Sequence, residues 1–261
     1  MTILDKILQE KRREVEKMLQ EQIAVHEQSA RPSLFDRLYQ TEKLQIISEI
    51  KRASPSKGLI NEGVNPVEQA LQYEQAGAAC ISVLTDTPFF KGSFDDLAAV
   101  ADNVQLPILC KDFIIHTVQI DRAKNAGASV ILLIVAALGD EELAKLFSYA
   151  TAQGLEVLVE VNSVEELQRA LTVDAKLIGV NNRDLRTFDV DLKKTAQIAA
   201  RFPFDEQRVL ISESGIWEEE DALFVAEKGA SAALVGESLM RSGNVKKAIQ
   251  CLQVKTAEAI Q

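Results

Sequence analysis

Residues 124–135 read KNAGASVILLIV, and this stretch holds the pattern that decides the fold. A helix is predicted to end near Gly127, because glycine readily adopts the left-handed backbone that terminates many helices. The six apolar residues that follow, 130–135, predict a strand buried on both faces, as strands of parallel sheets are. Similar small-residue tags surround Gly77 and Gly229, each directly before another apolar run. The chain therefore repeats one helix-to-strand unit.

Eight strands of this kind are predicted, and helical patterns lie between them. The predicted strands are residues 45–51, 80–85, 108–113, 130–135, 156–161, 177–181, 209–214 and 232–236. Helix starts are marked by Pro66 in a first turn and by the predicted N-caps Thr117, Asp140 and Ser163, the last completed as a capping box by Glu166. This alternation predicts an α/β fold, a (β/α)8 TIM barrel; a doubly wound open sheet is the lesser alternative.

The first 44 residues precede the first predicted strand. They are predicted to form one long amphipathic helix and a short second helix, an amino-terminal extension that packs on the barrel. The chain has 261 residues, close to the usual size of one such barrel. We therefore expect a single domain over residues 1–261, with residues 1–44 as the helical extension.

Composition restricts the partners and the location. The chain carries 29 Lys and Arg against 39 Asp and Glu, a net charge of −10, so it would repel nucleic acids and anionic membranes. No apolar run has the length of a membrane span, and the charged start lacks the features of a signal peptide. We expect a cytoplasmic protein that needs no nucleic acid, membrane or obligate protein partner.

The cysteines and histidines offer no metal or nucleophile site. Cys80, Cys110 and Cys251 are widely spaced in apolar surroundings and are expected to be reduced core residues. The two histidines, His26 and His116, are isolated, which disfavours both a zinc site and a Ser-His-Asp triad.

Polar residues lie at the carboxyl ends of most of the predicted strands, and this pattern predicts the active site. They are Glu49, Lys51, Lys111, Glu160, Asn181, Arg183, Glu213 and Ser214. Residues two apart in a strand point to the same side, so pairs such as Asn181 and Arg183 share a face. Structural ion pairs are the alternative for any one residue, but barrel enzymes work from this rim, so the whole set favours acid–base chemistry.

Two glycines and an aromatic group indicate what is bound. Gly215 and Gly236 follow the seventh and eighth strands, where many barrels bind phosphate, and the basic Lys51 is on the neighbouring first strand. These glycines favour a phosphorylated substrate; the alternative is that they serve only as turn residues. Phe89, Phe90 and Phe113, with the stiff segment Ser54-Pro55-Ser56, predict an aromatic-lined pocket beside these polar groups.

Seven segments together resemble the indole-3-glycerol phosphate synthase family, in the family's order. They are EIKRASPSKG (49–58), FKGS (90–93), LCKDF (109–113), VEV (159–161), GVNNRDL (179–185), SESGI (212–216) and LVGESLM (234–240). The first and fifth are long enough that a joint chance match is improbable. The resemblance covers essentially the whole chain, including the amino-terminal helix.

The resemblance implies a step of tryptophan biosynthesis without cofactor or metal: 1-(2-carboxyphenylamino)-1-deoxyribulose 5-phosphate becomes indole-3-glycerol phosphate, carbon dioxide and water. Lys111 then matches the general acid and Glu160 the base that assists dehydration, while Lys51 matches a cation near the carboxylate and phosphate. The other implied site residues are Glu49 and Asn181 as orienting groups, Arg183, Glu213 and Ser214 as supporting groups, Gly215, Gly236 and the N–H of Glu237 as a phosphate cradle, and Ser54, Pro55, Ser56, Phe90, Phe113 and Leu132 or Leu133 around the anthranilate ring.

Three features depart from the family pattern or match none of its roles. Many relatives carry a small serine where this chain has Glu237, and a carboxylate pointing inward there would weaken phosphate binding. No aromatic residue precedes Phe35, so the long first helix is not expected to offer the substrate an aromatic contact. Asp112 and His116 match no catalytic role, and substitutions there are expected to retain most activity.

Other functions fit parts of the pattern. A Schiff-base aldolase acting on a sugar phosphate would also use a barrel lysine, either Lys111 or Lys51. A phosphoribosylanthranilate isomerase would lack the SPSKG segment and the long first helix. A non-catalytic sugar-phosphate sensor would not need the intact set of acid, base and anion-binding groups.

Overall fold

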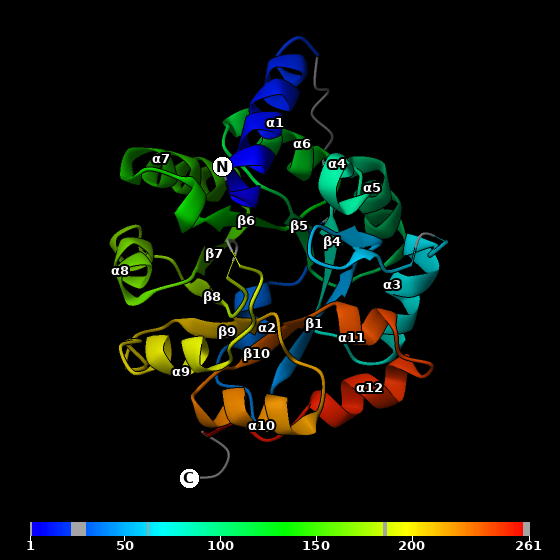
Figure 1. Cartoon of the computed structure of the whole chain (residues 1–261), viewed down its shortest axis with the longest axis vertical. Coiled ribbons are helices and arrows are strands. Elements are labelled where there is room, and N and C mark those ends of the chain that lie inside the picture. The colour runs from blue at the N-terminus through cyan, green and yellow to red at the C-terminus, as the bar shows by residue number, and fades with distance from the viewer. Residues whose placement is uncertain (1, 22–29, 62, 185–186, 258–261) are drawn as a thin grey trace.

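The strands of the chain close into a parallel barrel (Figure 1). The structure, a computed structural model, describes residues 2–21, 30–61, 63–184 and 187–257, so His26 and Leu185 lie outside the described residues. The barrel strands are β1 (Gln45–Ile50), β4 (Cys80–Leu84), β5 (Ile108–Lys111), β6 (Val130–Ile134), β7 (Glu156–Val161), β8 (Leu177–Asn181), β9 (Val209–Glu213) and β10 (Ala232–Val235). Ile47 of β1 pairs with both Cys80 of β4 and Leu234 of β10, which closes the ring. The predicted (β/α)8 barrel is confirmed and the open sheet is wrong.

Helices surround this ring and connect its strands (Figure 1). They are α3 (Pro66–Gln75), α4 (Thr87–Phe90), α5 (Phe94–Asn103), α6 (Thr117–Asn125), the 3-10 turn η1 (Val135–Ala137), α7 (Asp140–Ala152), α8 (Val164–Thr172), α9 (Lys193–Ala199), α10 (Glu219–Glu227), α11 (Glu237–Met240) and α12 (Val245–Leu252). The first loop also carries a small antiparallel hairpin of β2 (Ala53–Ser54) and β3 (Gly58–Leu59).

Six strands end one or two residues before their predicted ends; β7 and β8 end as predicted. The residues beyond the observed ends are mostly polar, such as Lys51, Thr85 and Asp112, and residue type there does not mark where the backbone leaves the strand. Ser214 shows the reason most clearly, because its φ of 64° places it in the left-handed region, which a strand does not contain.

Helix boundaries are predicted with mixed success. Pro66 is in a first turn, Ser163 caps α8 through the N–H of Glu166, and Gly77, Gly127 and Gly229 have the expected positive φ. The Glu166 carboxylate, however, accepts the N–H of Asn162 instead of completing a capping box with Ser163.

Two predicted N-caps are wrong by one residue, since His116 and Gly139 occupy the positions assigned to Thr117 and Asp140. The ring Nδ1 of His116 accepts the N–H of Val118. The N–H of Gly139 is bound by Glu142. Neither cap uses the side chain on which the prediction depended, which is the hydroxyl of Thr117 in one case and the carboxylate of Asp140 in the other.

The amino-terminal extension forms α1 (Ile3–Met18) and α2 (Leu34–Leu38) in its described part, as predicted. Val15 and Met18 of α1 pack on Val118 of α6, so the second half of α1 lies against α6 (Figure 1). Helix α2 instead closes the amino-terminal end of the barrel, where its leucines join the core inside the ring. The Glu156 carboxylate at the start of β7 accepts the hydroxyl of Ser33 at 3.0 Å and the N–H of Phe35 at 2.8 Å.

Residues 254–256 lie beside the start of β1. The N–H of Leu44 donates to the carbonyl of Val254 at 2.8 Å, and the N–H of Thr256 donates to the carbonyl of Glu42 at 3.1 Å. The two segments, distant in sequence, therefore form one continuous backbone contact at the base of the barrel.

Two further expectations concern the cysteines and membranes. Cys80 and Cys110 are buried and free as predicted, but Cys251 is exposed, because α12 packs through Ile249 and Leu252 and turns residue 251 outward. Within the described residues, no helix combines the length and the apolar character needed to cross a bilayer.

Candidate active site

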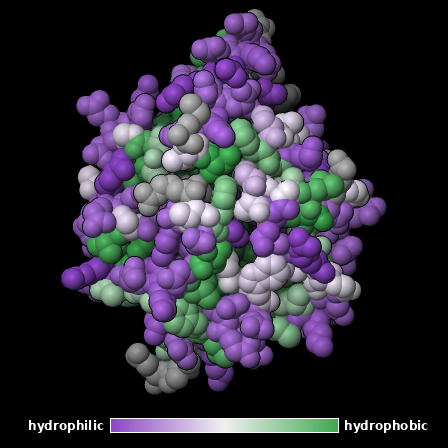
Figure 2. All heavy atoms as spheres, in the orientation of Figure 1, coloured by the Kyte–Doolittle hydropathy of each residue, from purple (hydrophilic) through white to green (hydrophobic). Residues whose placement is uncertain are grey.

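Nearly all the residues predicted for the site line one cavity at the carboxyl ends of the strands; Phe89, predicted for the aromatic pocket, is not among the residues that line it. The predicted residues that do line it are Glu49, Lys51, Ser54, Pro55, Ser56, Phe90, Lys111, Phe113, Leu132, Glu160, Asn181, Arg183, Glu213, Ser214, Gly215, Gly236 and Glu237. On the face that Figure 2 shows, hydrophobic residues lie near the middle within a largely hydrophilic surface. Strand alternation thus brings together side chains that are up to 188 residues apart in sequence, from Glu49 to Glu237.

A lysine between two carboxylates forms the centre of the cavity. The Nζ of Lys111 is 3.2 Å from Glu160 Oε2 and 3.0 Å from Glu213 Oε2. The carboxylate side chains are each only 2% exposed, against 14% for Lys111. In this arrangement the ammonium remains open to the cavity while its counter-ions are held in the wall.

Burial and charge act in opposite directions on this group. Burial alone would lower the pKa of Lys111, but the charges of Glu213 and Glu160 outweigh it and raise that pKa above the ordinary value. Lys111 is therefore a cation at neutral pH. Burial also raises the pKa of Glu213 to about 7, although the charge of Lys111 opposes this. One ammonium thus faces a carboxyl group that exchanges a proton near neutrality.

Two neighbours orient these charges. The Nδ2 of Asn181 donates to Glu160 Oε1 at 3.1 Å, so both oxygens of Glu160 are engaged. Glu49 forms an ion pair with Lys51 at 2.5 Å. The hydroxyl of Tyr73, a residue of α3, donates to the backbone carbonyl of Glu49. The orientation of Glu160 is thereby fixed before any ligand enters.

Two glycines make room for the buried carboxylates. A Cβ atom on Gly179 would lie 2.0 Å from Glu213 Oε1, and one on Gly236 would lie 2.6 Å from Glu49 Oε1. Gly179 sits inside β8, where a glycine weakens a strand, so its presence has a steric reason. This signal was available in the sequence and was missed.

One wall of the cavity is aromatic. The rings of Phe90 and Phe113 are 6.0 Å apart at an angle of 34°, and Leu132 points from β6 into the cavity. Leu133 belongs to the core between barrel and helices, so Leu132 is the one of the two leucines that borders the cavity. The Ser54 and Ser56 hydroxyls, 3.4 Å apart, line the same side.

The end of the cavity near β9 and β10 is formed by the predicted glycine loops. Gly215 has a φ of 88°, which favours glycine, and follows the left-handed Ser214. The Glu237 carboxylate accepts a hydrogen bond from Arg241, the residue that directly follows α11. That carboxylate is therefore paired with a cation at the end of the same helix. The guanidinium of Arg183 donates to the backbone carbonyl of Phe188 at 3.1 Å.

Sequence reasoning missed several residues of the cavity. Ile3 and Ile7 of α1 reach it, so the extension contributes aliphatic side chains where an aromatic one is absent. Trp217, the one tryptophan of the chain, lines the rim and is 49% exposed. None of the three was expected. Strand alternation does not predict where the side chains of α1 point, and Trp217 lies beyond the last residue of its motif.

Replacing Glu213 by glutamine should change how stability depends on pH. An acid whose pKa rises from 4.5 to about 7 on folding keeps its proton in the folded state while the unfolded chain loses it, so it destabilises the fold as pH rises through that window. We expect the stability difference between wild type and Glu213→Gln to change by on the order of 1–3 kcal/mol between pH 4.5 and 7, in favour of the variant at the higher pH. Urea unfolding at several pH values measures this; parallel curves for the two proteins would contradict the assignment.

Known proteins similar to this chain agree on its family. The family model described as indole-3-glycerol phosphate synthase matches residues 4–252. Proteins of that name from Oceanobacillus iheyensis and Listeria monocytogenes are each 52% identical to the chain, over 259 and 255 residues, covering 99% and 97% of it and 99% of each relative.

Solved structures show the fold alone. A structure of a mandelate oxidase variant with benzoyl-formic acid has a TM-score of 0.62 at 18% identity, covering 87% of this chain and 78% of the other. A 3-hexulose-6-phosphate synthase has a TM-score of 0.60 at 17% identity, covering 80% and 97%. On the match over nearly its whole length, the chain belongs to the indole-3-glycerol phosphate synthase family.

Proposed function

We propose that the chain is an indole-3-glycerol phosphate synthase that converts 1-(2-carboxyphenylamino)-1-deoxyribulose 5-phosphate into indole-3-glycerol phosphate, carbon dioxide and water. The observation that carries this function is the cationic Lys111, held between Glu160 and Glu213 at the floor of a cavity with one aromatic wall. The family of the chain supports the same reaction. The step belongs to tryptophan biosynthesis.

Lys111 acts as the general acid in ring closure. The ring carbon that bears the carboxyl group attacks the ketone, and the ketone oxygen gains negative charge as the new carbon–carbon bond forms. A proton from Lys111 turns that oxygen into a hydroxyl, and nearby carboxylates keep the lysine protonated beforehand. Loss of carbon dioxide then returns the electron pair to the ring and restores its aromaticity.

Glu160 acts in the dehydration that follows. Departure of the hydroxyl as water requires one proton on the leaving oxygen and removal of another from the ring system. Glu160 takes the second proton, and its contacts with Asn181 and Lys111 orient it for this transfer. No external electron acceptor is required, because the electrons remain in the new indole ring.

Substrate binding divides between the two ends of the cavity. The anthranilate ring lies against Phe90, Phe113 and Leu132, and the Ser54-Pro55-Ser56 segment borders it. Lys51 and the loops at Gly215 and Gly236 bind the phosphate, with the N–H of Glu237 as a donor. Glu49 and Asn181 bind the sugar hydroxyls, while Ser214 and Arg183 support the loops that carry these groups.

A turnover assay tests this function directly. The purified chain is incubated with the carboxyphenylamino-deoxyribulose phosphate, and indole fluorescence is followed with and without a chelator. We expect turnover in both cases. No product from folded protein would refute the proposal. A product adduct trapped on Lys111 or Lys51 by borohydride would favour the Schiff-base aldolase instead.

Replacing Lys51 by alanine should weaken anion binding. If Lys51 binds the phosphate, its loss removes a charged hydrogen bond, and the inhibition constant for inorganic phosphate should rise about tenfold or more. Competition of phosphate with the substrate measures the effect, and Lys57→Ala in the same loop is the matched control. Equal inhibition constants in wild type and Lys51→Ala would remove Lys51 from the anion site.

We further propose that the protein works in the cytoplasm, as one barrel domain that includes residues 1–44, with a small anionic sugar phosphate as its ligand. The net charge of −10 supports a small-molecule ligand, because it disfavours nucleic acids and anionic membranes as partners. Neither a cofactor nor an obligate protein partner enters the chemistry above.

A further inference from the structure

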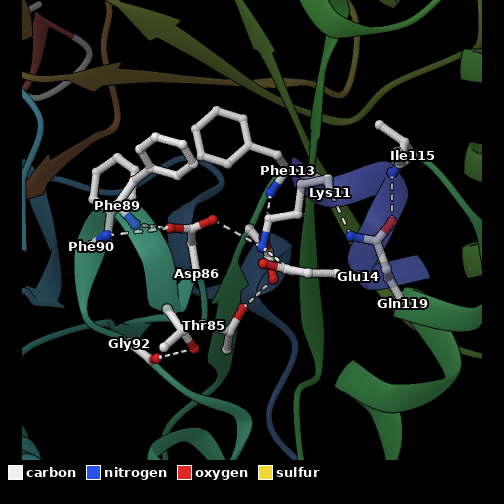
Figure 3. A network of polar contacts seen from close by, with 12 residues as sticks. Lys11, Glu14, Thr85, Asp86, Phe89, Phe90, Gly92, Phe113, Ile115 and Gln119 are labelled. Atoms are coloured by element: carbon white, nitrogen blue, oxygen red, sulfur yellow. Dashed lines mark hydrogen bonds and ion pairs between the residues drawn. The ribbon is translucent and has the colours of Figure 1, made fainter. Parts of the chain in front are cut away.

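A buried lysine of the amino-terminal helix lies within ion-pair distance of three carboxylates outside the cavity centre. The Nζ of Lys11 is 2.8 Å from Glu14, 2.9 Å from Asp86 and 2.8 Å from Asp112. The side chains of Lys11, Asp86 and Asp112 are each 1% exposed. Figure 3 shows Lys11 reaching from α1 toward Asp86, with phenylalanine rings gathered on one side of the contact. A buried charge of this kind is costly unless its partners compensate for it.

Each aspartate also holds one residue of the aromatic wall. Asp86 is the N-cap of α4, where its Oδ1 accepts the N–H groups of Phe89 and Phe90 at 2.8 and 3.2 Å. The other oxygen of Asp86 faces Lys11. The Phe90 ring lines the cavity, so the carboxylate paired with Lys11 sets the position of that ring.

Asp112 has the same double role on the next loop. Its Oδ1 accepts the N–H of Phe113 at 2.7 Å and is also the atom nearest Lys11, while Oδ2 accepts the Thr85 hydroxyl at 2.7 Å. The Phe113 carbonyl accepts a hydrogen bond from Gln119 at 3.0 Å, so the backbone of Phe113 is held on both sides. Asp112 also directly follows Lys111 in the chain.

The position of Lys11 on α1 adds a third connection. Ile3, Ile7 and Lys11 are spaced four residues apart and therefore lie on one face of the helix. The two isoleucines line the cavity, and Lys11 continues the same face into the loops after β4 and β5. Burial would lower the pKa of Lys11, but Asp112 and Asp86 outweigh it and raise that pKa, so the cation persists at neutral pH.

We propose that Lys11 is a positioning residue, which places the aromatic wall of the substrate cavity by bridging Asp86 and Asp112 from the amino-terminal helix. It touches neither the cavity nor the reacting atoms, and it acts through the backbones of Phe90 and Phe113. This inference rests on the proposed function for its kinetic consequences alone. It also changes the expectation for Asp112, which now has a role in the placement of Phe113.

The test compares Lys11→Met with Lys17→Met, an exposed lysine on the same helix. Methionine keeps the length of the side chain but leaves two buried aspartates facing each other without a cation. In the folded Lys11→Met protein we expect KM to rise about tenfold or more and kcat to fall, since small displacements near reacting groups are costly. The inhibition constant of 2-aminobenzoate, a probe of the ring subsite, should rise, while that of inorganic phosphate should not. Lys17→Met should match wild type in every measurement.

Hydrogen exchange gives a readout that needs no substrate. The amides of Phe89, Phe90 and Phe113 donate to the two aspartates, so they should exchange faster in Lys11→Met than in wild type. If Lys11→Met does not fold, Asp86→Asn decides the question, because asparagine keeps the helix cap but loses the charge that faces Lys11.

Two results overturn the proposal. One is wild-type KM and kcat in folded Lys11→Met, or in Asp86→Asn if the first variant does not fold. The other is unchanged exchange at the three amides. A merely structural role would lower the melting temperature and leave kinetics per folded molecule unchanged. Failure of wild type to turn over the substrate would instead refute the proposed function, and the exchange comparison would still test the role of Lys11.

Discussion

Replacing Lys111 by alanine should lower kcat by about three orders of magnitude while changing substrate affinity much less. The lost proton donor acts mainly as the ketone oxygen gains charge, so the interaction is stronger in the transition state than in the bound substrate. Steady-state kinetics with indole fluorescence separates kcat from KM. Wild-type turnover in Lys111→Ala would overturn the mechanism, even with the family assignment intact.

The same variant needs a control for its fold. Removing Lys111 leaves Glu160 and Glu213 as two buried carboxyl groups, each 2% exposed, without their shared cation. Because the pKa of Glu213 is already about 7, we expect that group to take up a proton and spare the fold. Circular dichroism and thermal unfolding check this, with the exposed Lys145→Ala of α7 as the matched control.

Replacing Glu160 by glutamine should lower kcat by about two orders of magnitude or more. Glutamine keeps the size of the side chain and a hydrogen bond with Asn181, but it cannot accept the proton that dehydration releases. The loss should also change the shape of the pH–rate profile, because the limb that belongs to the base disappears.

The pH profile distinguishes this role from a purely electrostatic one. If Glu160 only kept Lys111 protonated, Glu160→Gln would shift the alkaline limb, which reports the general acid. It would leave the acidic limb, which reports the base, in place. Measurement of kcat from pH 4 up to the alkaline limit of the fold, in wild type, Glu160→Gln and the exposed control Glu141→Gln, compares the acidic limb directly, since the raised pKa of Lys111 places its own limb at the alkaline end of the range. An unchanged base limb in Glu160→Gln would assign proton removal to another group.

The sequence predicts the barrel and the floor of its cavity because one simple rule governs both. Side chains two apart in a strand share a face, and parallel strands align their carboxyl ends, so Lys111, Glu160 and Asn181 must meet once the ring closes. The contacts among them confirm this placement. Residue roles in catalysis stay predictions, to be tested by the variants above.

Most of what escaped prediction depends on packing between elements. Lys11 lies in the charged run KRRE, where nothing local distinguishes it from Arg12 and Arg13, yet only the docking of α1 buries it. Ile3 and Ile7 enter the cavity for the same reason. The N-caps at His116 and Gly139 were missed for a local reason: each contact is with a residue of the capped helix itself, Val118 or Glu142, and not with the side chains of Thr117 or Asp140.

Barrel closure by β1 and β10 has a consequence for the order in which the chain can fold. On the ribosome, β1 emerges 187 residues before its partner, since Gln45 pairs with Ala232. Until then one side of β1 presents unpaired backbone groups, which invite pairing with other chains. The contacts of Leu44 with Val254 and of Glu42 with Thr256 form later still, because Val254 and Thr256 follow β10 in the chain. Any sheet formed before β10 is made therefore has two unpaired edges, and β1 is the edge that stays unpaired longest.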